Sequence, residues 1–154
     1  MPFWYPAVRR QRQFNPGRPL RRYRDYKPFL KVEFESRCVY CSCPDGLAPS
    51  DEHFGVDHYR PRSKFPGLER TYGNLYYACN HCNRLKGNFW IDPAVSPRFI
   101  PNPCDHVMSD HLSYRGVRIE THSAAGQTIN ELLCLSEPSF VTYREIVLAA
   151  AKSR

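Results

Sequence analysis

The sequence predicts an α+β fold. Its core is small and consists of two strands and one helix that are held together by cysteines. A helical flank precedes this core, and a hairpin and a helix follow it. Three observations predict this. Two Cys-x-x-Cys pairs bracket a strand–loop–strand pattern, a helical pattern follows the second pair, and an alternating stretch leads into helical spacing near the end. The length of 154 residues fits one domain with a modest core.

The first predicted element is a basic arm over residues 1–26. Its four prolines fix φ and lack a backbone donor, so we expect it to be irregular or extended. An aromatic anchor at its start is expected from Phe3, Trp4 and Tyr5. Residues 1–31 carry seven Arg and two Lys against one Asp, whereas the rest of the chain carries 13 basic and 14 acidic residues. An arginine-rich arm indicates a phosphate-bearing partner; the alternative is a solvated tail.

The predicted core spans residues 27–92. Residues 28–37, "PFLKVEFESR", suit a short helix with Pro28 in its first turn. After a tight turn in "CVYCSC", strands are expected at "FGVDH" and "NLYYAC", with the loop "YRPRSKFPGLERTYG" between them. "NHCNRLKGNFW" should begin as a turn and continue as a helix that ends near Gly87.

Residues 93–154 are predicted to form an extension that packs on the core. "LSYRGVRIETH" alternates around Arg115-Gly116, as a β-hairpin does. "QTINELLCL" suits a short helix. A last helix should follow, capped by Ser136, with Phe140, either Tyr143 or Arg144, and Val147 at helical spacing.

Four cysteines have the spacing of a metal clamp. Cys-x-x-Cys knuckles facing each other form a closed tetrahedral sulfur site that suits structural Zn²⁺, here with the ligands Cys38, Cys41, Cys79 and Cys82. The 37 residues between the knuckles contain the whole strand–loop–strand, so metal binding should stabilise it.

Other interpretations of the cysteines stay open. The four could be buried thiols or a redox pair, and Cys43 or His81 could change the choice of ligands. The total of seven cysteines is odd, which argues against a secreted disulfide framework. Cys104 and Cys134 are expected to be core thiols.

A second set of polar residues lies inside and just after the clamp: Asp57, His58, Asn74 and Asn83. A carboxylate and an amide oxygen are hard ligands that suit Mg²⁺ or Mn²⁺. A neutral histidine beside them could act as the general base for a water molecule. Asn74 could hold the imidazole in orientation. The sequence thus predicts a second, catalytic metal ion on Asp57 and Asn83.

The order Cys-x-x-Cys, Asp-His, Asn-Leu, Cys-x-x-Cys-Asn resembles the HNH endonucleases of the ββα-metal superfamily, over residues 38–87. The resemblance implies that His58 is the first His of the name and the general base. Asn74 is the middle Asn, and Asn83 occupies the last position, which is often His in the family. Asp57 and Asn83 would then hold the catalytic ion.

The flanks "DHYRPRSKFP", "NLYYACNHCNRLKG" and "RFIPNPCD" resemble a subfamily of bacterial HNH proteins. Some of those act beside an ATPase in anti-phage systems, so analogy suggests an antiviral defence role with an ATPase subunit as partner.

These patterns predict a metal-dependent HNH endonuclease that hydrolyses DNA, with RNA left open as a substrate. Five cations near the predicted base are the expected phosphate contacts: Arg60, Arg62, Lys64, Arg84 and Lys86. The alternative is a zinc-dependent nucleic-acid-binding module, or an accessory subunit, without cleavage activity of its own. A binding module needs neither a base nor hard metal ligands. The nuclease and the binding module are therefore distinguished by the presence of Asp57, His58, Asn74 and Asn83.

The sequence carries no apolar run near the ~20 residues that span a bilayer, and no apolar stretch typical of a signal peptide. We therefore expect a cytoplasmic protein without a membrane partner.

Overall fold

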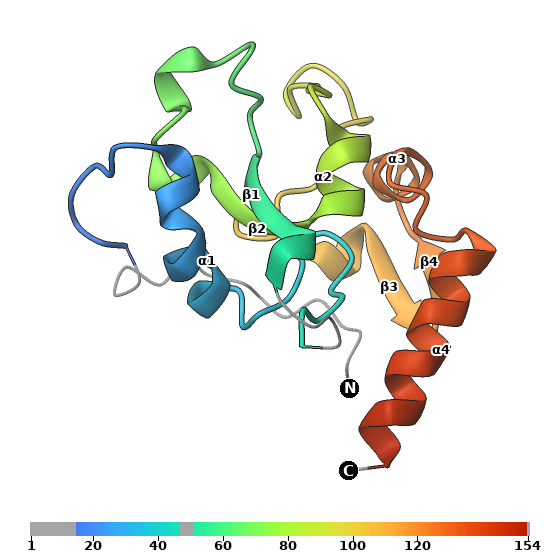
Figure 1. Ribbon diagram of the computed structural model, residues 1–154. Coiled ribbons are helices and arrows are strands. Elements are labelled where there is room, and N and C mark those ends of the chain that lie inside the picture. The colour runs from blue at the N-terminus through green and yellow to red at the C-terminus, as the bar shows by residue number, and fades with distance from the viewer. Residues whose placement is uncertain (1–14, 47–50, 154) are drawn as a thin grey trace.

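The computed structural model describes residues 15–46 and 51–153 (Figure 1). The predicted anchor Phe3, Trp4 and Tyr5 lies outside the described residues. The described chain is of mixed helices and strands, as predicted, with two separate antiparallel pairs of strands. No helix among the described residues is long and apolar enough to cross a bilayer.

The core is a ββα unit. Strand β1 (Phe54–His58) pairs antiparallel with β2 (Leu75–Cys79), and helix α2 (Asn80–Lys86) follows at once. The register pairs Phe54 with Cys79 and His58 with Leu75. The second cysteine knuckle therefore lies at one end of the strand pair, and the predicted base lies at the other end.

The start of α2 is set by the knuckle itself. Cys79 is the N-cap, and its Sγ accepts a hydrogen bond from the Cys82 backbone N–H at 3.5 Å. The helix therefore begins without the separate turn that the sequence predicts. It ends as expected at Gly87, which has a positive φ of 49°.

Helix α1 (Lys27–Glu33) is shorter than predicted. Pro28 occupies its first turn as expected, but the helix stops because Glu35 and Ser36 adopt positive φ angles of 53° and 58°. The end of the predicted arm lies against the core: the Leu20 backbone N–H donates to the hydroxyl of buried Tyr26 at 2.9 Å.

The hairpin of β3 (Leu112–Arg115) and β4 (Arg118–Thr121) turns at Gly116 and Val117. Helix α3 (Ala124–Leu132) begins before the predicted "QTINELLCL", because Ser123 caps it by accepting from the Gly126 backbone N–H at 3.0 Å.

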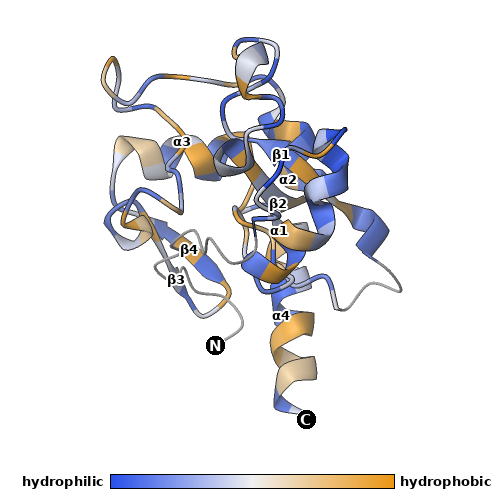
Figure 2. Cartoon of the chain, turned by 90° about the vertical axis from the view of Figure 1, so that its left-hand side faces the viewer, coloured by the Kyte–Doolittle hydropathy of each residue, from blue (hydrophilic) through white to orange (hydrophobic). Residues whose placement is uncertain are grey.

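Helix α4 (Pro138–Lys152) extends away from the body of the molecule (Figures 1 and 2). The predicted cap at Ser136 is wrong. Glu137 is the N-cap residue, and the Ser136 hydroxyl instead bonds Asn130 Oδ1 at 2.8 Å. Of the residues predicted at helical spacing, Arg144 and Val147 are buried, and Phe140 and Tyr143 are half-buried.

The core is rich in tyrosine, and the buried tyrosine hydroxyl groups form hydrogen bonds with polar side chains or with the backbone, as buried hydroxyls generally do. Tyr76 and Tyr77, neighbouring residues of β2, are fully buried. Tyr76 donates to Asn102, and Tyr77 donates to Asp45 at 2.6 Å. Both tyrosines belong to the core and are not exposed for base stacking.

Candidate active site and metal centre

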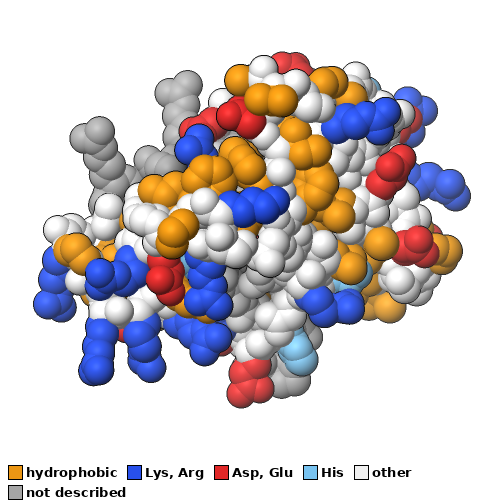
Figure 3. Space-filling model, turned by 90° about the horizontal axis from the view of Figure 1, so that it is seen from above, with side chains coloured by type: hydrophobic (Ala, Val, Ile, Leu, Met, Phe, Trp, Pro, Cys, Tyr) orange, Lys and Arg blue, Asp and Glu red, His pale blue; other side chains and the backbone are white. Residues whose placement is uncertain are grey.

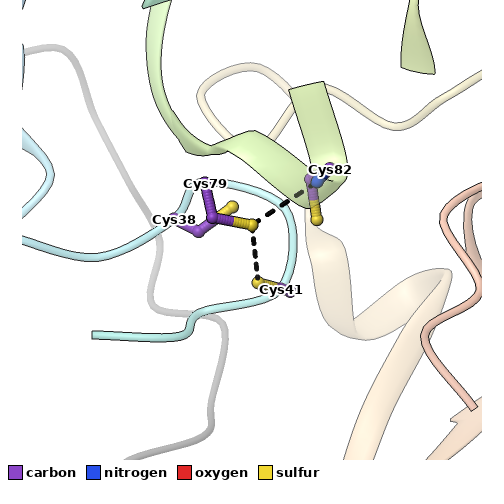
Figure 4. A group of neighbouring side chains, drawn as sticks. All are labelled: Cys38, Cys41, Cys79 and Cys82. Carbon is purple, nitrogen blue, oxygen red and sulfur yellow. Dashed lines mark hydrogen bonds between the residues drawn. The ribbon is translucent and has the colours of Figure 1, made fainter. Parts of the chain in front are cut away.

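The four predicted clamp cysteines converge. The Sγ atoms of Cys38, Cys41, Cys79 and Cys82 all lie within 4.8 Å of one another (Figure 4). Cys41 Sγ lies 3.8 Å from Cys79 Sγ. Burial and a bond with Cys38 raise the pKa of Cys41, but bonds with Cys43, Cys79 and Cys82 lower it to about 6 overall, toward the thiolate that binds metal. The set fits a closed tetrahedral Zn²⁺ site.

Of the two alternative ligands, His81 is engaged elsewhere and Cys43 lies beside the clamp. His81 lies 2.9 Å through Nε2 from the Leu133 carbonyl oxygen, and its ring packs against Phe140, so it joins the second knuckle to the extension. The Cys43 thiol is buried beside the clamp and bonds Cys41, but it is not one of the four sulfur atoms that converge. Cys104 and Cys134 are only half-buried.

His58 ends β1 with its imidazole held on two sides. Its Nε2 lies 2.9 Å from the Glu69 carbonyl oxygen. Because a carbonyl only accepts, this contact favours a proton on Nε2 and leaves Nδ1 as the basic nitrogen. The Tyr23 ring packs edge-on against the imidazole at 4.6 Å between centroids. Burial lowers the pKa of His58 from its usual 6.5, which favours the neutral form that a base requires.

Asn74 bonds the loop after His58. Its Oδ1 accepts from the Arg60 N–H at 2.8 Å, and its Nδ2 donates to the Arg60 carbonyl at 3.0 Å. Asn74 was expected to hold the imidazole. In the structure it fixes the backbone two residues further on, and the Glu69 carbonyl holds the ring.

Asp57 is buried and its carboxylate has two partners. The Tyr40 hydroxyl donates to Oδ2 at 2.5 Å, and the Lys86 ammonium lies 3.3 Å from Oδ2 and 3.4 Å from Oδ1. The hard carboxylate suits a divalent cation, but Lys86 already provides it with a positive charge. An ion bound to Asp57 would have to share the carboxylate with Lys86 or displace it.

Asn83 is half-buried on the side of α2 that faces β1, and its Nδ2 donates to the Val56 carbonyl at 3.4 Å. One turn further along α2, Lys86 donates to the His58 carbonyl at 2.7 Å. This face of α2 therefore lies along β1 next to Asp57 and His58, as the predicted site requires.

Four of the five predicted phosphate contacts are exposed: Arg60, Arg62, Lys64 and Arg84. The fifth, Lys86, differs from the prediction. Its side chain is 1% exposed and paired with Asp57, so it presents no charge to a phosphate at the surface. The guanidinium of Arg60 lies over the rings of Phe65 and Trp90, at 5.5 and 5.2 Å from their centroids.

Sequence reasoning missed three residues that contact the site: Tyr23, Tyr40 and Glu69. Glu69 acts through its carbonyl, which any residue type possesses, so no sequence signal could single it out. Tyr23 lies in the segment predicted as a free arm, where aromatic residues among arginines were the available signal. Tyr40, between the first two cysteines, was a foreseeable core residue.

Two strands and a helix bracketed by a four-sulfur site define a ββα-metal domain. In agreement, the family model for HNH endonucleases matches residues 38–89, which confirms the resemblance for this part of the chain. No curated protein and no solved structure matches the chain. Residues 38–89 are therefore an HNH domain with a four-cysteine cluster that could hold a metal ion, and the two flanks of the chain lie outside the match.

Proposed function

We propose that this protein is a metal-dependent endonuclease that hydrolyses phosphodiester bonds in DNA, with His58 as the general base. One observation carries the proposal. Within the matched HNH domain, the buried imidazole of His58 is held by a backbone carbonyl, and its burial lowers the pKa of the imidazole. A core histidine with only a packing role would not need to lie at the end of the strand, next to exposed arginines.

In the proposed reaction, Nδ1 of His58 takes a proton from the attacking water. The Glu69 carbonyl keeps the imidazole in the required tautomer, and Asn74 keeps the following loop in place. Arg60, Arg62, Lys64 and Arg84 contact the nucleic-acid backbone. A divalent ion on Asp57 and Asn83, Mg²⁺ or Mn²⁺, would stabilise charge on the phosphate and the leaving oxygen. The expected products carry a 5′ phosphate and a 3′ hydroxyl.

The test is cleavage of plasmid DNA by the zinc-loaded full chain, with Mg²⁺, Mn²⁺ or EDTA, beside His58→Ala. We expect His58→Ala to retain zinc and DNA affinity and to cut roughly 10²–10⁴-fold more slowly, the usual contribution of a general base. His122→Ala is the matched control, because His122 is exposed and its Nε2 contacts Ser113 on the hairpin. Equal rates for wild type and His58→Ala would refute the proposed mechanism. A wild type that binds DNA without cutting it would indicate a binding module.

The biological setting that we propose is an anti-phage system with an ATPase subunit, by analogy with the flanking sequences. Expression in a phage-sensitive host, with and without a candidate ATPase subunit, tests this. We expect phage resistance that requires both proteins and is lost in His58→Ala. Resistance without an ATPase partner would remove that part of the proposal.

A further inference from the structure

A hollow of about 320 Å³ lies beside the proposed base and is lined by five arginines, one tyrosine and one glutamate: Arg21, Arg22, Tyr23, Arg24, Arg62, Glu69 and Arg70. All five arginines are exposed. Four of these residues precede the matched HNH domain, and three come from the loop between β1 and β2. Figure 3 shows Lys and Arg side chains gathered at this side of the molecule, on the left as in Figure 1.

Two of the residues that line the hollow also contact His58. The Tyr23 ring packs against the imidazole, and the Glu69 carbonyl bonds Nε2. The hollow and the proposed base therefore have two residues in common as neighbours, Tyr23 and Glu69.

The side chains that line the hollow carry more positive than negative charge. Asp25 pairs with Arg22 at 2.9 Å, and Glu69 lies 3.4 Å from Arg62. Arg21, Arg24 and Arg70 have no carboxylate within 4.0 Å among the residues that the structure describes. Such clustered cations repel one another and are stabilised by an anion between them.

Tyr23 organises these cations. The guanidinium groups of Arg24 and Arg62 lie over its ring, at 5.5 and 5.1 Å from the centroid. Arg24 Nε also donates to the Tyr23 hydroxyl at 3.2 Å. One ring thus fixes an arginine from the N-terminal segment and an arginine from the strand-connecting loop, and it contacts His58 as well.

We propose that this arginine hollow binds a backbone phosphate of the nucleic acid, next to the phosphate that is cut at His58. The inference rests on the proposed function for its ligand. It adds a binding site, formed partly by residues outside the HNH domain, that holds the strand in register with the base. Each strand of a duplex carries one phosphate per about 3.4 Å of axis. A strand cut at His58 therefore carries further phosphates on either side of the cut, and the hollow beside His58 is where one of them would bind.

The first measurement is duplex affinity as a function of salt, using full-length His58→Ala protein so that nothing is cut. Arg21→Gln/Arg70→Gln removes two arginines and leaves Tyr23 and its stacked partners. We expect Kd to rise about tenfold, the equivalent of one charge-assisted contact. The slope of log affinity against log salt should fall by about 0.9, the value for one phosphate.

Arg115→Gln/Arg118→Gln is the matched control, because it removes the same charge from exposed positions on the β3–β4 hairpin. For this control, the slope of log affinity against log salt should equal that of the parent protein. A control that loses as much as the test variant would show a general charge effect and overturn the site.

The second measurement locates the phosphate. Duplexes that carry one neutral methylphosphonate at successive positions are compared on both proteins. At one position, the methylphosphonate should weaken binding to the parent protein. At the same position it should cause no further loss of affinity in Arg21→Gln/Arg70→Gln. Equal losses in both proteins at every position would overturn the proposed site and leave the nuclease proposal intact. A parent that binds no nucleic acid would overturn both proposals.

Discussion

The buried pair of Lys86 and Asp57 lies where strand β1 meets helix α2. Each side chain is at most 4% exposed, and Lys86 also donates to the His58 carbonyl. Burial lowers the pKa of Lys86, while Asp57 opposes this effect. An ion pair of this kind contributes little net stability by itself, but removing one member leaves a buried charge without its partner.

Lys86→Met should therefore destabilise the protein by about 3–5 kcal/mol. Asp57→Asn/Lys86→Met, which removes both charges, should recover a large part of that loss. Denaturant unfolding in saturating zinc measures the free energy of unfolding of the single and the double variant. If Asp57 also binds the catalytic ion, added Mn²⁺ should raise the stability of Lys86→Met more than that of wild type. Equal losses in the single and double variants would contradict the role of the pair.

Asn74→Ala should slow cleavage less than His58→Ala does, because the base remains and only the loop beside it loses its two bonds to Arg60. The loss should appear in kcat more than in duplex affinity. Single-turnover rates at saturating protein measure the first, and binding in EDTA measures the second. A loss confined to affinity would indicate that Asn74 positions phosphate contacts instead of the base.

Lys86 also shows where sequence reasoning fails at the scale of a residue. The convergence of the four cysteines and the position of Asn83 along β1 could be predicted, because a metal clamp and a site of hard ligands need those residue types at that spacing. A lysine in the last turn of a helix, two residues after Arg84, has the pattern of a solvent-exposed cation. Its burial depends on which face of α2 lies on β1, and tertiary packing decides that.

At the scale of elements, the ββα unit was predictable because its strands are bounded by loops and its helix by the knuckle and Gly87. The extension was less so. The start of α3 depends on Ser123 as a cap, and its position depends on a close contact between backbones. A Cβ atom on Gly126 would lie 1.8 Å from the His111 carbonyl oxygen, so only glycine allows α3 to cross there.

Gly126→Ala should destabilise the extension, by about 1–3 kcal/mol for overpacking that the backbone can partly relieve. A chain of this size should lose about 2–4 °C in Tm per kcal/mol. Gly67→Ala is the control, because an added Cβ there meets no atom within 4 Å. Thermal unfolding that is the same for both variants would contradict the close packing of α3 on His111.

At the scale of the whole molecule, the four-cysteine site joins segments that are far apart in sequence. The first knuckle follows α1, the second begins α2, and His81 connects the second to the extension through Leu133 and Phe140. The strand pair that carries His58 lies between the two knuckles. The orientation of the proposed base therefore depends on a metal site at the other end of the strands.

We expect one zinc per chain, and loss of the fold when it is removed. Structural zinc in small domains contributes on the order of 10 kcal/mol. Cys79→Ser should therefore lose both zinc and cooperative unfolding. Cys134→Ser is the control, because Cys134 lies outside the cluster and bonds the Glu131 carbonyl. Elemental analysis and circular dichroism measure the two effects, and a folded wild type without zinc would contradict the assignment.

The distance along the chain between the two knuckles also has a consequence during synthesis. Cys41 and Cys79 are separated by 37 residues, and ribosomes add about 5–20 residues per second. The first pair of thiols therefore emerges roughly two to seven seconds before its partners. During that interval it can be oxidised or can bind an unsuitable metal. Zinc supply during translation should then determine how much of the newly made protein becomes active.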